Sequence, residues 1–173
     1  MMLTPAVRKF ALAAHIMSSI GWFGAVAVFL ALAVAGMTSK DARLVRASYL
    51  SMELTTWSVI VPLAFLSLLS GVVSSLITNW GLFRYYWVLL KLLMTTFATI
   101  VLLIHTQPIG LLAAAAKTMS PFTSALQSQQ LLMVTASSAT VVMLIVLTVL
   151  SVLKPPGVIR LGARKREQRA PTQ

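Results

Sequence analysis

Four ionisable side chains lie within or at the edges of long apolar stretches of this sequence: His15, Glu53, Lys91 and His105. An ionisable group near the centre of a membrane costs at least about 2.5–3.5 kcal/mol, so each one indicates a functional site. His15 is the strongest candidate, because its neighbours along the helix are apolar and its short side chain cannot reach the lipid headgroups. A neutral imidazole at this position can ligate a metal or form a hydrogen bond across helices.

The spacing of these residues predicts which of them meet. His15 and Trp22 are one seven-residue step apart, which turns a helix by only about 20°, so they share a face. Lys91 and His105 also share a face but are separated by about 21 Å along the axis. If the first and third helices run parallel, His15 and Lys91 lie at similar depth, whereas His15 and His105 differ by about 20 Å. The two histidines therefore cannot both ligate one haem.

Each residue also has a plainer interpretation. Lys91 stands about one turn inside its helix and can extend its amine to the headgroups. His105 can lie at the membrane interface near a helix end, and Glu53 can lie outside the hydrocarbon. His15 can act as a neutral hydrogen-bonding residue between helices.

Composition places all of these residues in a membrane protein. Of the 173 residues 58% are hydrophobic and 10% charged, and the mean hydropathy is +0.91. The absence of cysteine excludes disulfides, iron–sulfur clusters and thiolate catalysis. The net charge of +11 does not indicate a nucleic-acid partner, because the basic residues flank apolar stretches and collect in one tail.

Four stretches reach the length of about 20 residues that a spanning helix needs. We predict an all-α, polytopic membrane protein, an up-down-up-down bundle of four transmembrane helices. Segment 37–53 is expected to be a short surface helix or an outward extension of the second helix. We expect a kink at Pro62, an end to the third helix at Pro108, and a short interfacial helix over 111–117. The predicted helices span about 7–36, 54–77, 86–106 and 130–153, within a domain of residues 1–153 that precedes a basic tail, 154–173.

Ten of the 14 Lys and Arg residues fall on the side of the two termini and four on the other. Cytoplasmic segments carry the excess of basic residues, which predicts cytoplasmic N- and C-termini in the inner (plasma) membrane of a bacterial-type cell. The tail is expected to bind anionic lipids. Small residues of the first helix, such as Gly21 and Ala25, favour close helix packing. A homo-oligomer or a membrane partner subunit is compatible with such packing.

Two short motifs resemble a known group of bacterial membrane proteins. His15-Ile-Met-Ser-Ser-Ile-Gly-Trp22-Phe-Gly is similar to the His-x6-Trp motif of the HemJ-type protoporphyrinogen oxidases. Trp87-Val-Leu-Leu-Lys91-Leu is similar to the Trp-x3-Lys-Leu that opens the third helix of that family. The wider group includes the copper-resistance D family and predicted membrane proteins without an assigned function. Leu89 stands where the oxidases have a histidine two residues before the lysine.

The resemblance implies a haem b site, with His15 as the iron ligand and Lys91 as a second functional residue. Trp22 and Trp87 would supply flat apolar walls for the macrocycle, and Lys91 would pair with a propionate. The first function hypothesis is therefore a haem-binding redox membrane protein resembling protoporphyrinogen oxidase. The alternative is a non-enzymatic four-helix scaffold or partner subunit without a cofactor, in which the polar residues pack and anchor helices. A copper-handling protein is disfavoured by the lack of Cys and of clustered Met.

Overall fold

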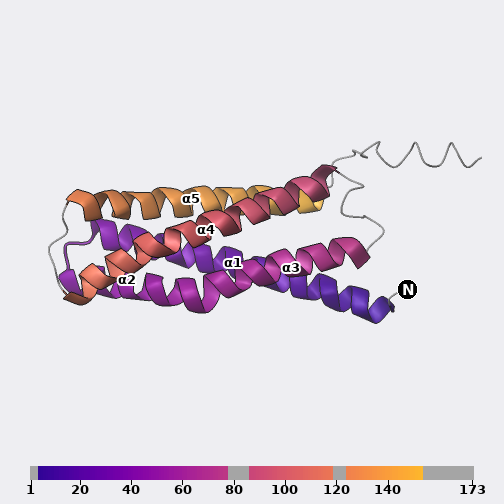
Figure 1. Cartoon of the computed structure of the whole chain (residues 1–173), viewed down its shortest axis with the longest axis horizontal. Helices are drawn as coiled ribbons and strands as arrows, with labels where there is room; N and C mark the ends of the chain where they lie inside the picture. Colours follow the sequence, from indigo (N-terminus) through magenta and orange to yellow (C-terminus); the bar gives the residue numbers. More distant parts are fainter. Residues whose placement is uncertain (1–3, 78–85, 119–123, 154–173) are drawn as a thin grey trace, which may run out of the picture.

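The computed structural model describes residues 4–77, 86–118 and 124–153 of the chain. Within these ranges the protein is helical and contains no strand, which confirms the predicted all-α class. The second helix, a π-helical turn and the third helix follow one another without a break and make one rod (Figure 1). The described residues thus form four long helical rods. The elements are α1 Pro5–Thr38, α2 Ala42–Thr55, the π-helical turn η1 Thr56–Ile60, α3 Val61–Ile77, α4 Tyr86–Thr118 and α5 Ser124–Leu153.

All four rods are long and apolar enough to cross a membrane. Large apolar side chains face outward from them, including Phe10 at 76% exposure and Met17 at 75%. A water-soluble bundle would bury such residues, whereas lipid chains solvate them. The chain therefore has the character of a multi-pass membrane protein in contact with the lipid bilayer.

The second rod begins earlier than predicted. Helix α2 starts at Ala42, and the carboxylate of Asp41 caps it by accepting a hydrogen bond of 2.9 Å from the Arg43 N–H. The predicted start near Leu54 is wrong, and the alternative that segment 37–53 extends the second helix outward is correct from Ala42 onward. The charged residues of this segment made it look too polar for a packed helix, because Arg43 and Arg46 lie on the exposed side of a helix whose Tyr49 and Met52 are buried.

A π-helical turn interrupts this rod just before Pro62. The N–H of Val61 bonds to the carbonyl of Thr56, five residues earlier, which is the π-helical spacing. Pro62 has no N–H, and its ring crowds the carbonyl of the preceding turn. The wider π turn accommodates this crowding, so the irregularity expected at Pro62 occurs one turn ahead of it.

Pro108 does not end the third rod, contrary to the prediction. Helix α4 continues through it to Thr118, and the segment predicted as a separate interfacial helix is the last part of α4. Ile109, Leu112 and Ala113 beyond the proline are buried, so packing against the bundle outweighs the loss of one backbone hydrogen bond. Helix α5 likewise begins at Ser124, earlier than the predicted Gln130.

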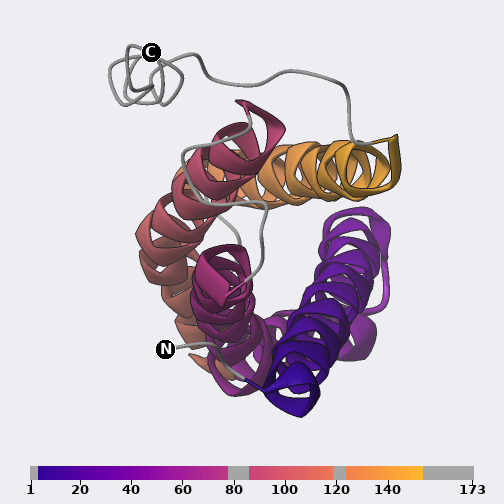
Figure 2. The same ribbon diagram turned by 90° about the vertical axis from the view of Figure 1, so that its right-hand side faces the viewer.

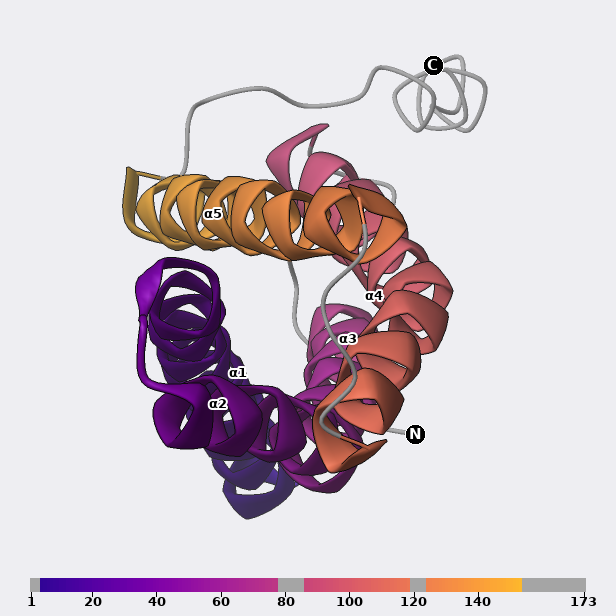
Figure 3. The same cartoon turned by 90° about the vertical axis from the view of Figure 1, so that its left-hand side faces the viewer.

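The rods pack around a common core, as the two end-on views show (Figures 2 and 3). Helix α1 contacts α2, α3 and α5, and α4 contacts α2, α3 and α5. Helices α1 and α3 run antiparallel, since Ala11 pairs with Ser74 and Ser19 with Ser67. The buried side of α1 repeats every three or four residues and comprises Ser18, Trp22, Val26, Phe29, Ala33 and Gly36.

Candidate functional site

His15 is joined to α3. Its Nδ1 lies 3.1 Å from the Ser67 carbonyl oxygen and 3.2 Å from Ser70 Oγ. A carbonyl can only accept, so Nδ1 carries the proton and Nε2 carries the lone pair of a neutral imidazole. The ring lies against Gly71, where an added Cβ would meet His15 Cε1 at 3.0 Å. Glycine at this position is what allows the imidazole to lie flush with α3.

Serine side chains continue this contact along the two helices, and we call the set the α1–α3 polar seam. Ser19 and Ser67 are hydrogen-bonded at 2.8 Å, and Ser18 and Ser70 at 3.4 Å. Ser18 was expected as a small packing residue of the first helix, whereas the α3 serines were not predicted. Their signal was present, because Ser67, Ser70 and Ser74 recur at the three- and four-residue steps of one helix face. The seam consists of His15, Ser18, Ser19, Ser67, Ser70 and Ser74.

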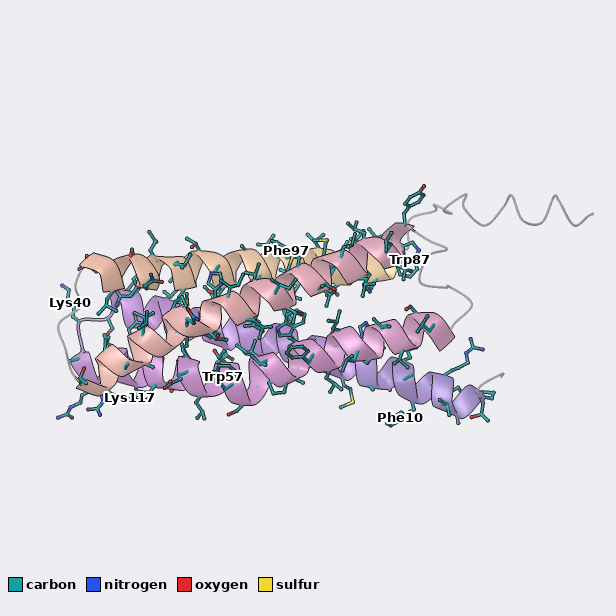
Figure 4. The ribbon with its side chains drawn as sticks, in the orientation of Figure 1. Phe10, Lys40, Trp57, Trp87, Phe97 and Lys117 are labelled. Atoms are coloured by element: carbon teal, nitrogen blue, oxygen red, sulfur yellow. The ribbon has the colours of Figure 1, made fainter. Side chains whose placement is uncertain are left out.

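Lys91 is joined to α5. Its Nζ donates a hydrogen bond to Ser151 Oγ, near the end of that helix, and lies 6.0 Å from the centre of the Trp87 ring. Trp87 lies at the end of the molecule to which Phe10 also belongs, as Figure 4 shows. Lys91 and His15 form their hydrogen bonds with different helices, α5 and α3.

His105 lies within α4 and not at its end, because the helix continues past Pro108. Its Nδ1 is 2.7 Å from the Val101 carbonyl oxygen in the preceding turn. The ring lines a half-enclosed pocket in the bundle, together with Trp22. The Trp22 side chain is 2% exposed, and its Nε1 has no hydrogen-bond partner among the described residues.

Glu53 forms an ion pair with Lys117, with 2.9 Å between Oε2 and Nζ. The Glu53 and Lys117 side chains are 31% and 57% exposed. The pair ties α2 to the last turn of α4, at the end of the molecule where Lys40 also lies (Figure 4). The sequence also allows a polar pair of Glu53 and His105 at the outer ends of their helices, but Glu53 pairs with Lys117 instead.

Of the four residues of the hypothetical haem site, Trp22 borders the pocket that His105 also lines, and the other three are not among its lining residues. Trp22 borders the pocket, His15 lies in the polar seam, and Lys91 and Trp87 lie at the start of α4. Over the described ranges, no group of three or more His, Cys, Asp and Glu side chains is placed to hold a metal ion. The haem site remains a prediction.

Comparisons with protein-family models, with curated proteins and with solved structures found no match to this chain. The function must therefore be argued from the geometry of the site itself.

Proposed function

We propose that this protein is a non-enzymatic membrane protein, a small scaffold or partner subunit that acts through association with other membrane components. One observation supports this best: the ionisable side chains within the rods form hydrogen bonds inside the bundle. His15 bonds to α3, Lys91 to α5, and His105 to its own helix. The bonds of His15 and Lys91 join helices and need no substrate.

Hydrogen bonds between helices decide which helices associate in a bilayer. Lipid chains are as apolar as leucine, so apolar surface alone does little to select which helices associate. Interhelical hydrogen bonds select partners and register, and each contributes about 0.6 kcal/mol on average in a membrane bundle. The polar seam fixes α1 against α3, and Lys91–Ser151 fixes α4 against α5. The rigid bundle that results presents an apolar outer surface to lipid and to any partner.

The proposal includes an orientation. The N-terminal Arg8 and Lys9 and the start of α4 with Lys91 would face the cytoplasm, and Lys40 and Lys117 the opposite side of the inner membrane. The rods would then cross the bilayer in the up-down-up-down order. Arg84 and the basic tail, 154–173, which weigh heavily in the charge count, lie outside the described residues. The tail would add affinity for anionic lipids.

A haem-binding redox protein is the second candidate, and the His15 tautomer favours it. With its proton directed to the Ser67 carbonyl, the ring retains a lone pair on Nε2, the arrangement that backbone hydrogen bonds impose on many ligating histidines. His15 would hold the iron, and the Lys91 amine would pair with a propionate. Haem b would supply one-electron chemistry. This candidate is second because His15 and Lys91 form their hydrogen bonds with different helices, α3 and α5.

The visible absorption spectrum of the purified full-length protein separates the two functions. We expect a folded preparation without a Soret band, and spectra of His15→Ala and His105→Ala that do not differ from the native one. A Soret band that His15→Ala abolishes and His105→Ala retains would overturn the scaffold proposal and establish the haem site. His105→Ala is the matched control, since it removes the other histidine of the chain.

A further inference from the structure

One polar side chain faces outward from the apolar part of the third rod. Gln107 is exposed on α4, and its amide forms no hydrogen bond within the described part of the chain. Its neighbours on this side of the helix are apolar, since Ile104, one turn before it, is 64% exposed and Leu111, one turn after it, is 58% exposed. A primary amide without a partner is costly in an apolar medium, so Gln107 needs an explanation that packing inside the bundle does not give.

The position of Gln107 along α4 places its amide within the hydrocarbon. The helix is about 50 Å long and the hydrocarbon about 30 Å thick, so about 10 Å of a centred rod lies outside at each end. Gln107 is about 16 Å from the end of α4 at Thr118, and thus about 6 Å inside the hydrocarbon. Helical side chains lean toward the N-terminus of their helix, which for Gln107 leads deeper into the membrane. The amide is therefore directed away from the nearer headgroups.

A backbone acceptor lies next to this amide on the same side of α4. Because Pro108 has no N–H, the carbonyl of Ile104, four residues earlier, loses its regular helical donor. The hydroxyl of Thr106 does not replace that donor, since it donates to the Leu103 carbonyl at 2.7 Å. The outer side of α4 thus presents a donor on Gln107 and an acceptor on Ile104 within one turn of each other.

Apolar residues continue from this polar spot along the outer side of α4. Leu93, Phe97, Ile100 and Ile104 are all exposed and, together with Gln107, follow one another in alternating steps of four and three residues. This spacing is that of the contact positions in left-handed pairs of helices. Figure 3 shows α4 at the edge of the bundle, and its contacts with α2, α3 and α5 use its other side. A second helix can therefore pack along the outer side over several turns.

We propose that a second copy of this chain docks on the outer side of α4, with Gln107 of each copy donating a hydrogen bond to the Ile104 carbonyl of the other. Copies inserted in the same orientation bring these groups to the same depth. A two-fold axis along the membrane normal then forms both bonds at once and leaves neither donor without an acceptor. The proposal rests on the scaffold function, because it names the partner with which the bundle associates.

Dimerisation of the full-length protein in lipid vesicles tests this assignment. Copies labelled at the N-terminus with a donor or an acceptor dye are mixed, and energy transfer at increasing lipid-to-protein ratios gives the dissociation constant. Gln107→Leu removes the amide, and Pro108→Ala returns the missing backbone N–H. Gln127→Leu is the matched control, because it removes another exposed glutamine, in the first turn of α5.

We expect the native chain to dimerise and Gln107→Leu to raise the dissociation constant by about five- to tenfold, the factor implied by two lost hydrogen bonds between membrane helices. Pro108→Ala should have a similar effect, because the Ile104 carbonyl then bonds within its own helix. The double variant should dimerise no more weakly than either single variant, since both substitutions remove the same two bonds. Gln127→Leu should leave the dissociation constant unchanged.

Disulfide trapping in the same vesicles identifies the face that the two copies share. Ile100→Cys, on the outer side of α4, should form cross-linked dimers, and Val142→Cys, which is 60% exposed on α5, should not. Cross-links at Val142 without cross-links at Ile100 would assign the contact to α5 and contradict the proposal. Monomers at every lipid-to-protein ratio, or a dissociation constant that Gln107→Leu leaves unchanged, would also overturn it.

The absorption spectrum of the same preparation reports on the scaffold function separately. Colourless protein that stays monomeric would overturn the α4 contact and leave the scaffold function standing. A Soret band in a protein whose dimer depends on Gln107 would overturn the scaffold function and support the α4 contact.

Discussion

The His15 imidazole lies within an apolar stretch of α1 and is nonetheless well accommodated. Its N–H has two acceptors on α3, and Gly71 leaves room for the ring. A neutral, hydrogen-bonded histidine avoids the cost of a buried charge. The residue that the sequence singled out as the strongest candidate for a functional site is therefore satisfied by hydrogen bonds within the bundle.

Gly71→Ala should weaken the bundle by crowding His15. The new Cβ would lie 3.0 Å from His15 Cε1, and the ring cannot withdraw without loosening its bonds to Ser67 and Ser70. Overpacking of this kind costs about 1–3 kcal/mol, more than the gain of up to about 1 kcal/mol from replacing a helical glycine. We expect a net loss of about 1 kcal/mol in the unfolding free energy measured in mixed micelles.

Gly24→Ala is the control for this prediction, because no atom lies within 4 Å of its added Cβ. The control should be neutral or stabilising. Equal effects of the two substitutions would show that the close approach at Gly71 does not matter.

For single residues, helical periodicity predicted which side chains share a face of a helix. It did not predict which neighbouring helix each side chain contacts. The spacing of His15 and Trp22 placed both on the inner side of α1, yet His15 contacts α3 while Trp22 borders the central pocket. Depth counting predicted that Lys91 lies near His15, and the structure shows that Lys91 donates its hydrogen bond to Ser151 of α5. The choice of Ser151 as the hydrogen-bond partner depends on lateral packing, which one sequence does not reveal.

Two prolines act differently on the elements that contain them. Pro62 follows a π-helical turn in the second rod, whereas α4 continues through Pro108 as an α-helix. Sequence rules treat a proline as an end or a kink. Helix α4 continues through Pro108 because Ile109, Leu112 and Ala113 are buried. This burial is a tertiary effect that the local sequence does not encode.

Cysteine labelling tests the continuity of α4 beyond Pro108. Its 33 residues extend over about 50 Å, more than the hydrocarbon thickness of about 30 Å, so its final turns should reach water. The chain has no native cysteine, so single substitutions report cleanly. Ala114→Cys, on the exposed side, should react rapidly with a water-soluble maleimide, and Ala113→Cys, which is buried, should be protected.

These two alanines are adjacent and differ only in the direction they face. Similar labelling rates at both positions would contradict a packed, continuous helix and favour the separate interfacial helix.

At the scale of the whole molecule, hydropathy was sufficient to predict the class. The four apolar stretches form helical rods that are long and apolar enough to cross a membrane, because a polypeptide in lipid must satisfy its backbone hydrogen bonds internally. The helix ends were predicted less well, since the polar parts of α2 and α5 lie on helices that extend beyond the apolar stretches. Basic residues gather at both ends of the molecule, which makes the orientation a separate experimental question.

Reporter fusions decide that orientation. A reporter at Ala170 should be active as a cytoplasmic fusion, and one after Thr38, at the end of α1, as an external fusion. An external signal from Ala170 would reverse the proposed orientation and place Lys91 and its surroundings on the outer side.

A double-mutant cycle between His15 and Ser70 tests the central claim that polar contacts fix the helices of this bundle. Unfolding free energies would be measured for the native protein, His15→Ala, Ser70→Ala and the double variant, so that effects outside the pair cancel. We predict a favourable coupling energy of about 0.6 kcal/mol, and no more than about 1.7 kcal/mol, the range for hydrogen bonds between membrane helices. A coupling energy of zero would contradict a structural role for the His15–Ser70 contact.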